Sequence, residues 1–412
     1  MSRKTITICI AIVTAFLLVL FTADITLRLS EDNTAKAFGL WSNTSSAYEE
    51  RYTRLDQVYS ILTERYYKEV DEETLLLGAI NGMTASLDDP YTMYFTGEEM
   101  RELNTTRSGE YVGIGVMVRI LDDGYIYIAR VFGNSPAQEA GLRKGDIIMA
   151  SDGLELKAYT SSELTEAVSH IKGLENSYVN LTIKRGEELF DCSVMRAAVV
   201  QNRTEYLMLD DKIAYVSLSE FFGTAVQDVK NALDYIKEND AQALIFDLRN
   251  NTGGLLDQCV DITDMFLPES VIVYTQDRSG EKVYYYSDAS SLDLPMAVLV
   301  NGNTASASEI FAAAVQDTGV GTIVGTTTFG KGIVQTIYPF NEDGAALQLT
   351  TSQYYTPSGR TIHKTGVTPD VEVEYQQNET ADPASVFEIL PETDNQLKAA
   401  YEYLLVELNK AE

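Results

Sequence analysis

The segment from Met296 to Gln335 constrains the fold more than any other part of the chain. Its apolar run Met296–Val300 predicts a buried strand, and the turn sequence Asn301-Gly302-Asn303 ends that strand. The residues after the turn are small and then helix-forming, so Ser306 lies where a strand gives way to a helix. Such a turn exposes a hydroxyl beside the free N–H groups of a helix start. The segment therefore predicts a nucleophilic serine.

A lysine between two glycines follows in the same segment. A second expected strand, Val320–Val324, leads to Gly330-Lys331-Gly332, and Gln335 comes shortly afterwards. The glycines leave room for another backbone to approach the lysine. Because an amine can serve as the base of a serine nucleophile, Ser306, Lys331 and Gln335 form a plausible catalytic set.

Histidine and cysteine are scarce in the chain. The only two histidines are His170, in a polar helical stretch, and His363, in a loop rich in Gly and Thr. Neither has an obvious place in a Ser-His-Asp triad, which favours the variant with a lysine base. The three cysteines, Cys9, Cys192 and Cys259, are far apart and show no metal-binding spacing. They indicate buried free thiols, with no metal site and no disulfide framework.

The region around the serine alternates strands with helices. Ile213–Leu218 and Ala243–Leu248 predict strands, and Ala225–Glu238 and Leu255–Phe266 predict helices, which together indicate an α/β fold with crossovers. The pair Gly253-Gly254 opens the second helix, so its N–H groups could bind an oxyanion together with those at Ser306. The alternative is that the pair only makes a tight turn, and the residues alone do not separate the two interpretations.

Residues 109–197 show a different pattern, with short strands and glycine turns. Its motifs are Gly113-Ile114-Gly115, Ser135-Pro136-Ala137, Ala140-Gly141-Leu142 and Gly145-Asp146-Ile147-Ile148. This order resembles a PDZ domain. The N–H groups of Gly113, Ile114 and Gly115 can cradle a terminal carboxylate while a peptide adds as a strand. An ordinary small β-barrel with a glycine turn is the alternative, and the later motifs disfavour it.

The N-terminus carries an apolar run over residues 6–23, long enough to span a bilayer. Two positive charges before it and Asp24 after it predict that residues 1–5 form a cytoplasmic stub. A cleaved signal peptide is the rival interpretation, but it would place Phe21 where a small residue is required. We therefore expect a single-pass transmembrane anchor in the cell membrane, a stalk over residues 24–47, and the bulk of the chain outside the cytoplasm.

The remaining segments flank these domains. Residues 48–108 predict a small helical region, which we expect to pack against another part of the protein or against its copy in a homodimer. Beyond Gln335, a hairpin over 336–351 is expected, followed by loops that begin at Tyr354. Residues 376–412 predict a polar linker and an amphipathic C-terminal helix.

The net charge and the sequence after Lys331 argue against nucleic acid and nucleotides as partners. The net charge of −30 comes from 61 acidic and 31 basic residues, which argues against nucleic acid. Residues 325–331 fit the start of a phosphate-binding loop, but Gly332 replaces the hydroxyl residue and a β-like sequence follows where a helix is needed. We expect no cofactor and no metal.

The motifs, taken together and in order, resemble those of the carboxy-terminal processing proteases, the tail-specific serine peptidases with a PDZ domain. The matching segments cover roughly residues 48–374: Ala79-Ile80-Asn81-Gly82-Met83, Ser86-Leu87-Asp88-Asp89-Pro90-Tyr91, the PDZ segment, Asp247-Leu248-Arg249-Asn250-Asn251-Thr252-Gly253-Gly254, Thr304-Ala305-Ser306-Ala307-Ser308-Glu309-Ile310 and Thr328-Phe329-Gly330-Lys331-Gly332-Ile333-Val334-Gln335. One departure is Asn251-Thr252, where the family usually has a proline before the glycine pair.

The resemblance implies a peptidase core over residues 198–375 and a role for each site residue. Ser306 would be the nucleophile, Lys331 the general base and Gln335 the residue that orients the lysine. Gly253 or Gly254, with Ala307, would supply the oxyanion hole, while Asp317 matches a family acid of less certain role. Ser308 is a near neighbour whose spacing to Lys331 fits the family less well.

The implied function is an endopeptidase whose PDZ domain captures protein substrates by a free C-terminus. An adaptor that binds C-termini without catalysis is the alternative from a different class. The presence of Ser306, Lys331 and Gln335 argues against it.

Overall fold

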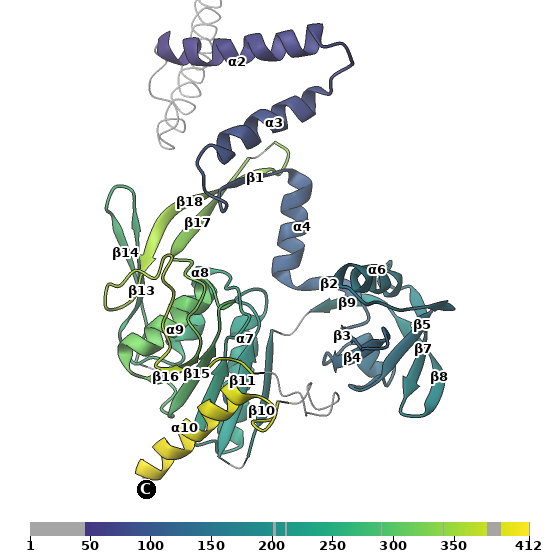
Figure 1. The fold of residues 1–412 in the computed structure, drawn as a ribbon, viewed down its shortest axis with the longest axis vertical. Coiled ribbons are helices and arrows are strands. Elements are labelled where there is room, and N and C mark those ends of the chain that lie inside the picture. The colour runs from purple at the N-terminus through teal and green to yellow at the C-terminus, as the bar shows by residue number, and fades with distance from the viewer. Residues whose placement is uncertain are drawn as a thin grey trace, which may run out of the picture. The chain divides into compact units, whose positions relative to one another are not determined.

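The computed structural model describes residues 46–200, 203–210, 212–289, 291–340, 342–376 and 389–411, and the chain divides after Met83 into two compact units (Figure 1). The expected anchor over 6–23, the stalk, Cys9 and most of the linker lie outside these residues. Within the described residues, no helix has both the length and the apolar character needed to cross a membrane.

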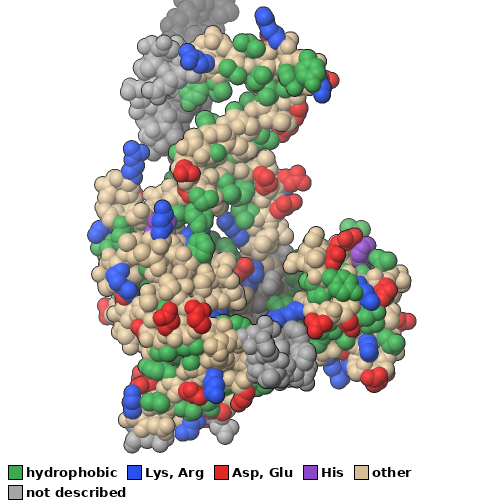
Figure 2. Space-filling model, viewed as in Figure 1, with side chains coloured by type: hydrophobic (Ala, Val, Ile, Leu, Met, Phe, Trp, Pro, Cys, Tyr) green, Lys and Arg blue, Asp and Glu red, His purple; other side chains and the backbone are tan. Residues whose placement is uncertain are grey.

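The first unit contains helix α2 (Ser46–Arg65) and most of helix α3 (Glu72–Ala85), which confirms the expected helical pattern. The phenol of Tyr59 donates to Glu72 Oε2 at 2.5 Å and links the two helices. Hydrophobic side chains gather along this pair in Figure 2, and Leu55, Val58 and Ile61 of α2 are exposed. The homodimer remains a prediction.

The second unit begins with helix α4 (Gly97–Ser108). Thr96 forms a capping box with Glu99, and Gly109 ends the helix in the left-handed conformation with φ +71°. A five-strand antiparallel path, β3-β4-β5-β7-β8, then surrounds a core that includes Ile126, Ile148 and Leu181. The elements of this PDZ domain are β2 (Glu110–Gly113), β3 (Val116–Ile120), β4 (Ile126–Val131), α5 (Pro136–Glu139), β5 (Ile147–Ser151), β6 (Leu154–Glu155), α6 (Ser161–Ile171), β7 (Tyr178–Arg185), β8 (Glu188–Met195) and β9 (Ala197–Val200).

The α/β core is a six-stranded sheet in the order β10-β11-β12-β15-β16-β19, parallel except for β10. Helices α7, α8 and α9 pack on the face that carries Val216 and Phe246, and α10 packs on the face that carries Ile245 and Leu299. Its elements are β10 (Thr204–Met208), β11 (Ile213–Leu218), α7 (Ala225–Glu238), β12 (Ala243–Asp247), α8 (Leu256–Asp264), β15 (Met296–Val300), α9 (Ala307–Thr318), β16 (Gly321–Gly325), β19 (Val371–Glu372) and α10 (Asn395–Ala411).

A second, antiparallel sheet was only partly expected. Its strands are β1 (Met93–Phe95), β13 (Val271–Asp277), β14 (Lys282–Tyr286), β17 (Ile333–Pro339) and β18 (Ala346–Tyr355). The expected hairpin is longer than predicted, so Tyr354, which we placed in a loop, belongs to strand β18. The hairpin β13–β14 and strand β10 were not predicted, because their sequences lack a clear apolar alternation.

Candidate active site

Ser306 lies at the turn between strand β15 and helix α9, as its sequence context predicted. Its backbone has φ +59° and ψ −118°, a conformation that residues other than glycine seldom adopt. Its N–H donates to Glu309 Oε2 at 2.8 Å, and the residue is half-buried at the wall of a cleft. The turn thus holds the serine at the end of a parallel strand, where α/β folds place their ligands.

Ser308 is unsuited to be the nucleophile. The residue is fully buried, and its hydroxyl donates to the carbonyl oxygen of Asn251 at 3.0 Å. It therefore anchors helix α9 to the glycine loop, while Ser306 faces the cleft.

The glycine loop passes directly beside Ser306. A Cβ atom on Gly253, whose φ is +102°, would lie 2.8 Å from Ser306 Cβ and 2.7 Å from the carbonyl oxygen of Ala305, so only glycine fits. The Gly253 N–H donates to Asn251 Oδ1 at 2.9 Å. Within the described chain, no acceptor is recorded for the N–H groups of Gly254 and Ala307, and both residues line the cleft with Ser306.

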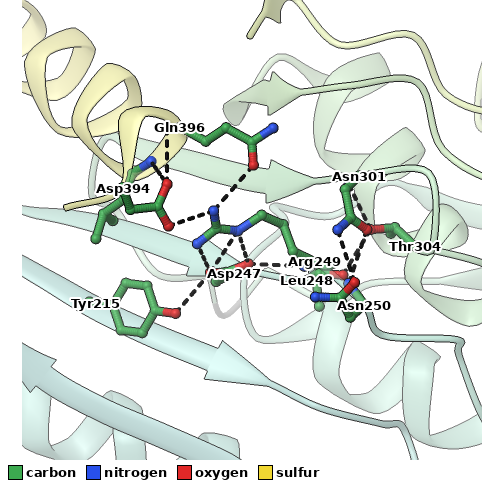
Figure 3. A network of polar contacts seen from close by, with 10 residues as sticks. Tyr215, Asp247, Leu248, Arg249, Asn250, Asn301, Thr304, Asp394 and Gln396 are labelled. Carbon is green, nitrogen blue, oxygen red and sulfur yellow. Dashed lines mark hydrogen bonds and ion pairs between the residues drawn. The ribbon is translucent and has the colours of Figure 1, made fainter. Parts of the chain in front are cut away.

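A buried ion-pair network lies at the end of strand β12, immediately before the glycine loop in the sequence (Figure 3). Arg249 Nη2 contacts Asp247 Oδ2 at 2.6 Å, and Tyr215 donates to the same oxygen at 2.8 Å. Arg249 Nη1 also reaches Asp394 Oδ2 at 2.7 Å and Gln396 Oε1 at 3.2 Å, which ties the loop to the start of α10. Burial alone would lower the pKa of Arg249, but the Asp247 carboxylate raises it above its usual value.

Asparagine side chains join the two loops that carry the site. Asn250 N–H donates to Asn301 Oδ1 at 3.0 Å, and Asn301 Nδ2 donates back to Asn250 Oδ1 at 3.1 Å (Figure 3). Thr304 Oγ1 donates to the carbonyl oxygen of Leu248 at 2.8 Å. Because β12 and β15 are neighbouring parallel strands, both loops emerge at the same edge of the sheet, and these bonds fix their separation.

Lys331 lines the cleft with Ser306, and its amine lies over an aromatic ring. Nζ lies 4.4 Å from the centre of the Tyr91 ring. No hydrogen bond from this amine to Ser306 or Gln335 is recorded among the residues that the structure describes. Burial lowers the pKa of Lys331, while Asp89 raises it by a smaller amount. Ile333 and Val334 line the cleft with Lys331 and Tyr91 covers its amine, whereas Phe329, earlier in the same loop, is exposed.

Gln335 also lines the cleft, on strand β17. Its Nε2 donates to Thr350 Oγ1 at 3.2 Å, on the neighbouring strand β18. This bond fixes the amide group while leaving its oxygen available to the cleft.

Two further side chains connect the backbones of Ser306 and Lys331, and the sequence analysis gave neither of them a role. Glu309 is fully buried, and its carboxylate accepts from Lys331 N–H at 2.8 Å, from Gly330 N–H at 2.7 Å and from Thr328 Oγ1 at 2.5 Å, in addition to Ser306. The hydroxyl of Tyr354 contacts the carbonyl oxygens of Ser306 and Lys331. The Ser-x-x-Glu spacing of a capping box could have identified Glu309.

Other residues singled out in the sequence do not line the cleft. His363 Nδ1 accepts from Gly332 N–H at 3.4 Å, and Asp317 pairs with Arg360 and accepts from Ser358 N–H at 2.9 Å. Cys192 and Cys259 are free thiols; only Cys259 is fully buried, and burial raises its pKa to about 12.

The expected peptide loop of the PDZ domain, Gly113-Ile114-Gly115, is buried and lines a small groove. The carbonyl of Ile114 accepts from Ala137 N–H at 2.8 Å, and that of Gly115 accepts from Phe132 N–H at 2.9 Å. Their own N–H groups have no recorded partner within the described residues. A groove beside this loop is lined by Val116 of β3, Val168 of α6 and Lys172.

Comparisons with known proteins follow the same division of the chain. Residues 212–373 match the model of peptidase family S41, residues 112–195 the PDZ domain, and residues 22–99 the N-terminal domain of the activating protease CtpB. A carboxyl-terminal-processing protease of Synechocystis sp. is 36% identical over 359 residues, which cover 84% of this chain and 81% of that protein.

Other relatives include serine proteases with similar coverage of this chain. A probable CtpA-like serine protease of Staphylococcus aureus is 33% identical over 337 residues, which cover 81% of this chain and 67% of that protein. In further strains of that species the match spans 64% of the relative's length. The solved structure of a putative S41 protease from Bacteroides fragilis is 20% identical, covers 77% of this chain and 90% of that chain, and has a TM-score of 0.52, which supports the fold.

Proposed function

This chain belongs to peptidase family S41, as a serine peptidase of the carboxyl-terminal-processing kind, and from that premise we propose that Ser306 and Lys331 form its catalytic dyad. The observation that carries the proposal is the shared cleft. It joins a half-buried serine, a lysine whose pKa is lowered by burial, and the N–H groups of Gly254 and Ala307. Ser308, the other serine of the motif, has no access to that cleft.

The reaction starts with proton transfer from Ser306 Oγ to the neutral amine of Lys331. The oxygen then bonds to the carbonyl carbon of the substrate peptide, and the resulting oxyanion accepts hydrogen bonds from Gly254 and Ala307. The Gly253 N–H is already donated to Asn251, so Gly253 contributes close approach instead. The carbon–nitrogen bond breaks as the Lys331 ammonium gives its proton to the departing amine.

Water completes the cycle. The neutral lysine takes a proton from water, the hydroxide attacks the acyl-enzyme ester, and Ser306 regains its proton as the new carboxylate leaves. For each step the amine must leave the Tyr91 ring and reach Ser306, and the oxygen of Gln335 can accept a hydrogen bond that aims it. A neutral amide suits this task, because a carboxylate would stabilise the ammonium form.

Substrate selection is assigned to the PDZ domain. We propose that the N–H groups of Ile114 and Gly115 bind the terminal carboxylate of a protein substrate, while the substrate's last residues add beside the edge strand β3. The N–H groups of Ile114 and Gly115, which have no recorded partner within the described residues, and the groove that the loop lines support this assignment. The captured polypeptide is then cleaved at Ser306.

We further propose that the protein is anchored in the cell membrane through residues 6–23, with its catalytic part outside the cytoplasm. The support is the apolar run and its flanking charges. The test is membrane fractionation of the full chain beside a chain that lacks residues 1–23. The full chain should sediment with membranes and the shortened chain should not; equal sedimentation would contradict the anchor.

The catalytic proposal is tested with a matched pair of serine variants. Ser306→Ala should abolish cleavage of a quenched peptide and labelling by a phosphonate probe, with little change in melting temperature. Ser308→Ala should keep labelling and most activity, while losing about 1 kcal/mol of stability with its buried hydrogen bond. Activity surviving in Ser306→Ala would remove Ser306 from the role of nucleophile.

A further inference from the structure

Tyr354 places one hydroxyl group between the backbones of the two catalytic residues. Its oxygen lies 3.1 Å from the carbonyl oxygen of Ser306 and is also in hydrogen-bond contact with the carbonyl oxygen of Lys331. The side chain is 1% exposed and its ring belongs to the apolar core of the α/β domain. Within that core, the hydroxyl is aimed at the backbone of the active site.

The two carbonyl groups depend on this hydroxyl to different degrees. The carbonyl of Ser306 also accepts from the N–H groups of Glu309 at 2.9 Å and Ile310 at 3.0 Å, as part of helix α9. The carbonyl of Lys331 has no other recorded donor among the described residues. Because a phenol donates one hydrogen at a time, the hydrogen serves Lys331.

The backbone of Lys331 has a second attachment through its N–H group. Glu309, on helix α9, accepts the N–H of Lys331 at 2.8 Å, and the same oxygen accepts the N–H of Ser306 at 2.8 Å. Lys331 is thus held by a carboxylate through its N–H and by a phenol through its carbonyl. Its backbone is fixed on both sides while its amine stays free to move.

We propose that Tyr354 is a positioning residue for the cleavage reaction: its hydroxyl fixes the backbone of Lys331 relative to Ser306, so that the lysine amine can reach the serine hydroxyl. This inference rests on the proposed dyad. Burial keeps the pKa of Tyr354 well above its usual value, so the phenol remains a donor wherever the enzyme works.

Removing the hydroxyl should affect catalysis more than binding. In Tyr354→Phe the ring and its packing remain, but the Lys331 carbonyl loses its donor and the loop can shift. Because misplacing a catalytic group by about 1 Å can cost roughly a hundredfold in rate, we expect kcat to fall about ten- to hundredfold while KM changes less than about twofold.

The pH profile gives a second readout that a purely structural role would not change. The groups that set the Lys331 pKa are its burial, Asp89, Arg107 and Glu309, and Tyr91 covers the amine. A looser loop lets water reach the amine and reduces the effect of burial. The rise of kcat/KM with pH should therefore move to higher pH in Tyr354→Phe.

Tyr355→Phe is the matched control, because it removes the same group from the next residue of strand β18. That hydroxyl contacts Gln353 Oε1 at 3.2 Å on the exposed side of the strand. Both variants are compared with the unmodified full chain for kcat, KM, pH profile and melting temperature. Tyr355→Phe should leave all four unchanged.

Each outcome decides the proposal. A folded Tyr354→Phe with an unchanged kcat and pH profile overturns it, and so does loss of cooperative unfolding, which would assign the hydroxyl to the fold alone. A similar fall of kcat in Tyr355→Phe would also overturn the proposal. Failure of the dyad itself is recognised separately, because Ser306→Ala would then retain cleavage.

Discussion

Two serines separated by one alanine show how strongly the surroundings decide chemistry at the scale of a residue. Ser306 faces the cleft, whereas Ser308 is sealed against the glycine loop by its bond to Asn251. Sequence spacing favoured Ser306, and the structure supplies the physical reason. Local sequence thus predicted correctly that Ser306 lies at a turn between a strand and a helix.

The surroundings of Lys331 could not be predicted in the same way. Tyr91 and Tyr354 reach the lysine from distant parts of the chain, and their contacts exist only once strands β1, β17 and β18 have paired. Among the sequence neighbours, Ile333 and Val334 line the cleft with Lys331, whereas the side chain of Phe329 is exposed. The sequence neighbours of Lys331 therefore account for part of its surroundings, and Tyr91 adds a contact that they do not reveal.

The lowered pKa of Lys331 predicts how activity depends on pH. Only the neutral amine can accept the serine proton, so kcat/KM should rise with pH through one step, below the value of about 10.4 for a free lysine. Lys331→Arg should be inactive because arginine stays protonated. Gln335→Glu should move the step to higher pH, since a carboxylate favours the ammonium.

The measurement is one quenched peptide assayed over pH with these variants and the unmodified chain. Activity in Lys331→Arg would remove lysine from the role of base. A Gln335→Glu profile that coincides with that of the unmodified chain would place Gln335 away from the amine.

At the scale of elements, the crossovers of the α/β core were predictable because buried strands alternate with amphipathic helices. Strands β11, β12 and β15 and helix α7 lie close to the expected bounds. Strands β13 and β14 were missed, since the tyrosines and polar residues of 271–286 give no clean alternation. What the sequence could not reveal is the connection between helix α10 and the glycine loop.

That connection predicts a stabilising role for Asp394. Its Oδ1 accepts from Gln396 N–H and Leu397 N–H at 3.0 Å each, which caps α10, while its Oδ2 pairs with Arg249. Asp394→Ala should lower the free energy of unfolding by about 1–3 kcal/mol, because a lost cap alone costs about 0.5–2 kcal/mol. Activity should also fall, since Arg249 supports the glycine loop.

Lys398→Ala is the control for this prediction. It removes an exposed ion pair with Glu402, 3.8 Å long, on the same helix, and should change stability by no more than about 0.5 kcal/mol. Urea denaturation measures both variants. Equal stability of the two would mean that neither the cap of α10 nor the Arg249 contact of Asp394 contributes to the fold.

At the scale of the whole molecule, the chain combines a peptide-binding module with a peptidase. Glycine and strand patterns identified both parts, because each has local motifs of its own. How peptide binding by the PDZ domain affects the peptidase core depends on contacts between residues far apart in the sequence, and no motif encodes these contacts. Peptide binding and peptide cleavage are therefore measured separately.

Binding of a substrate by the PDZ domain should depend on the negative charge of the substrate's C-terminal carboxylate. Amidation of the C-terminus removes a charge-assisted hydrogen bond to the loop at Ile114, worth about 1.5–3 kcal/mol, so affinity should fall about tenfold or more. Fluorescence polarisation with a paired acid and amide peptide measures this, and cleavage at saturating peptide serves as the control. Equal affinities would exclude carboxylate binding as the basis of selection.

The positive φ of Ser306 also has a consequence for the evolution of the protein. A side chain in a sparsely populated backbone region costs of order 1–3 kcal/mol, so the nucleophile is held at the expense of thermodynamic stability. Ser306→Gly would relieve that cost while keeping the N–H that Glu309 accepts, although glycine gains about 0.5–1 kcal/mol of freedom in the unfolded chain. We expect the glycine variant to be inactive and to melt above Ser306→Ala in calorimetry, with a lower melting temperature contradicting this. Serine would then be the less stable of the two residues, retained because glycine has no hydroxyl to act as the nucleophile.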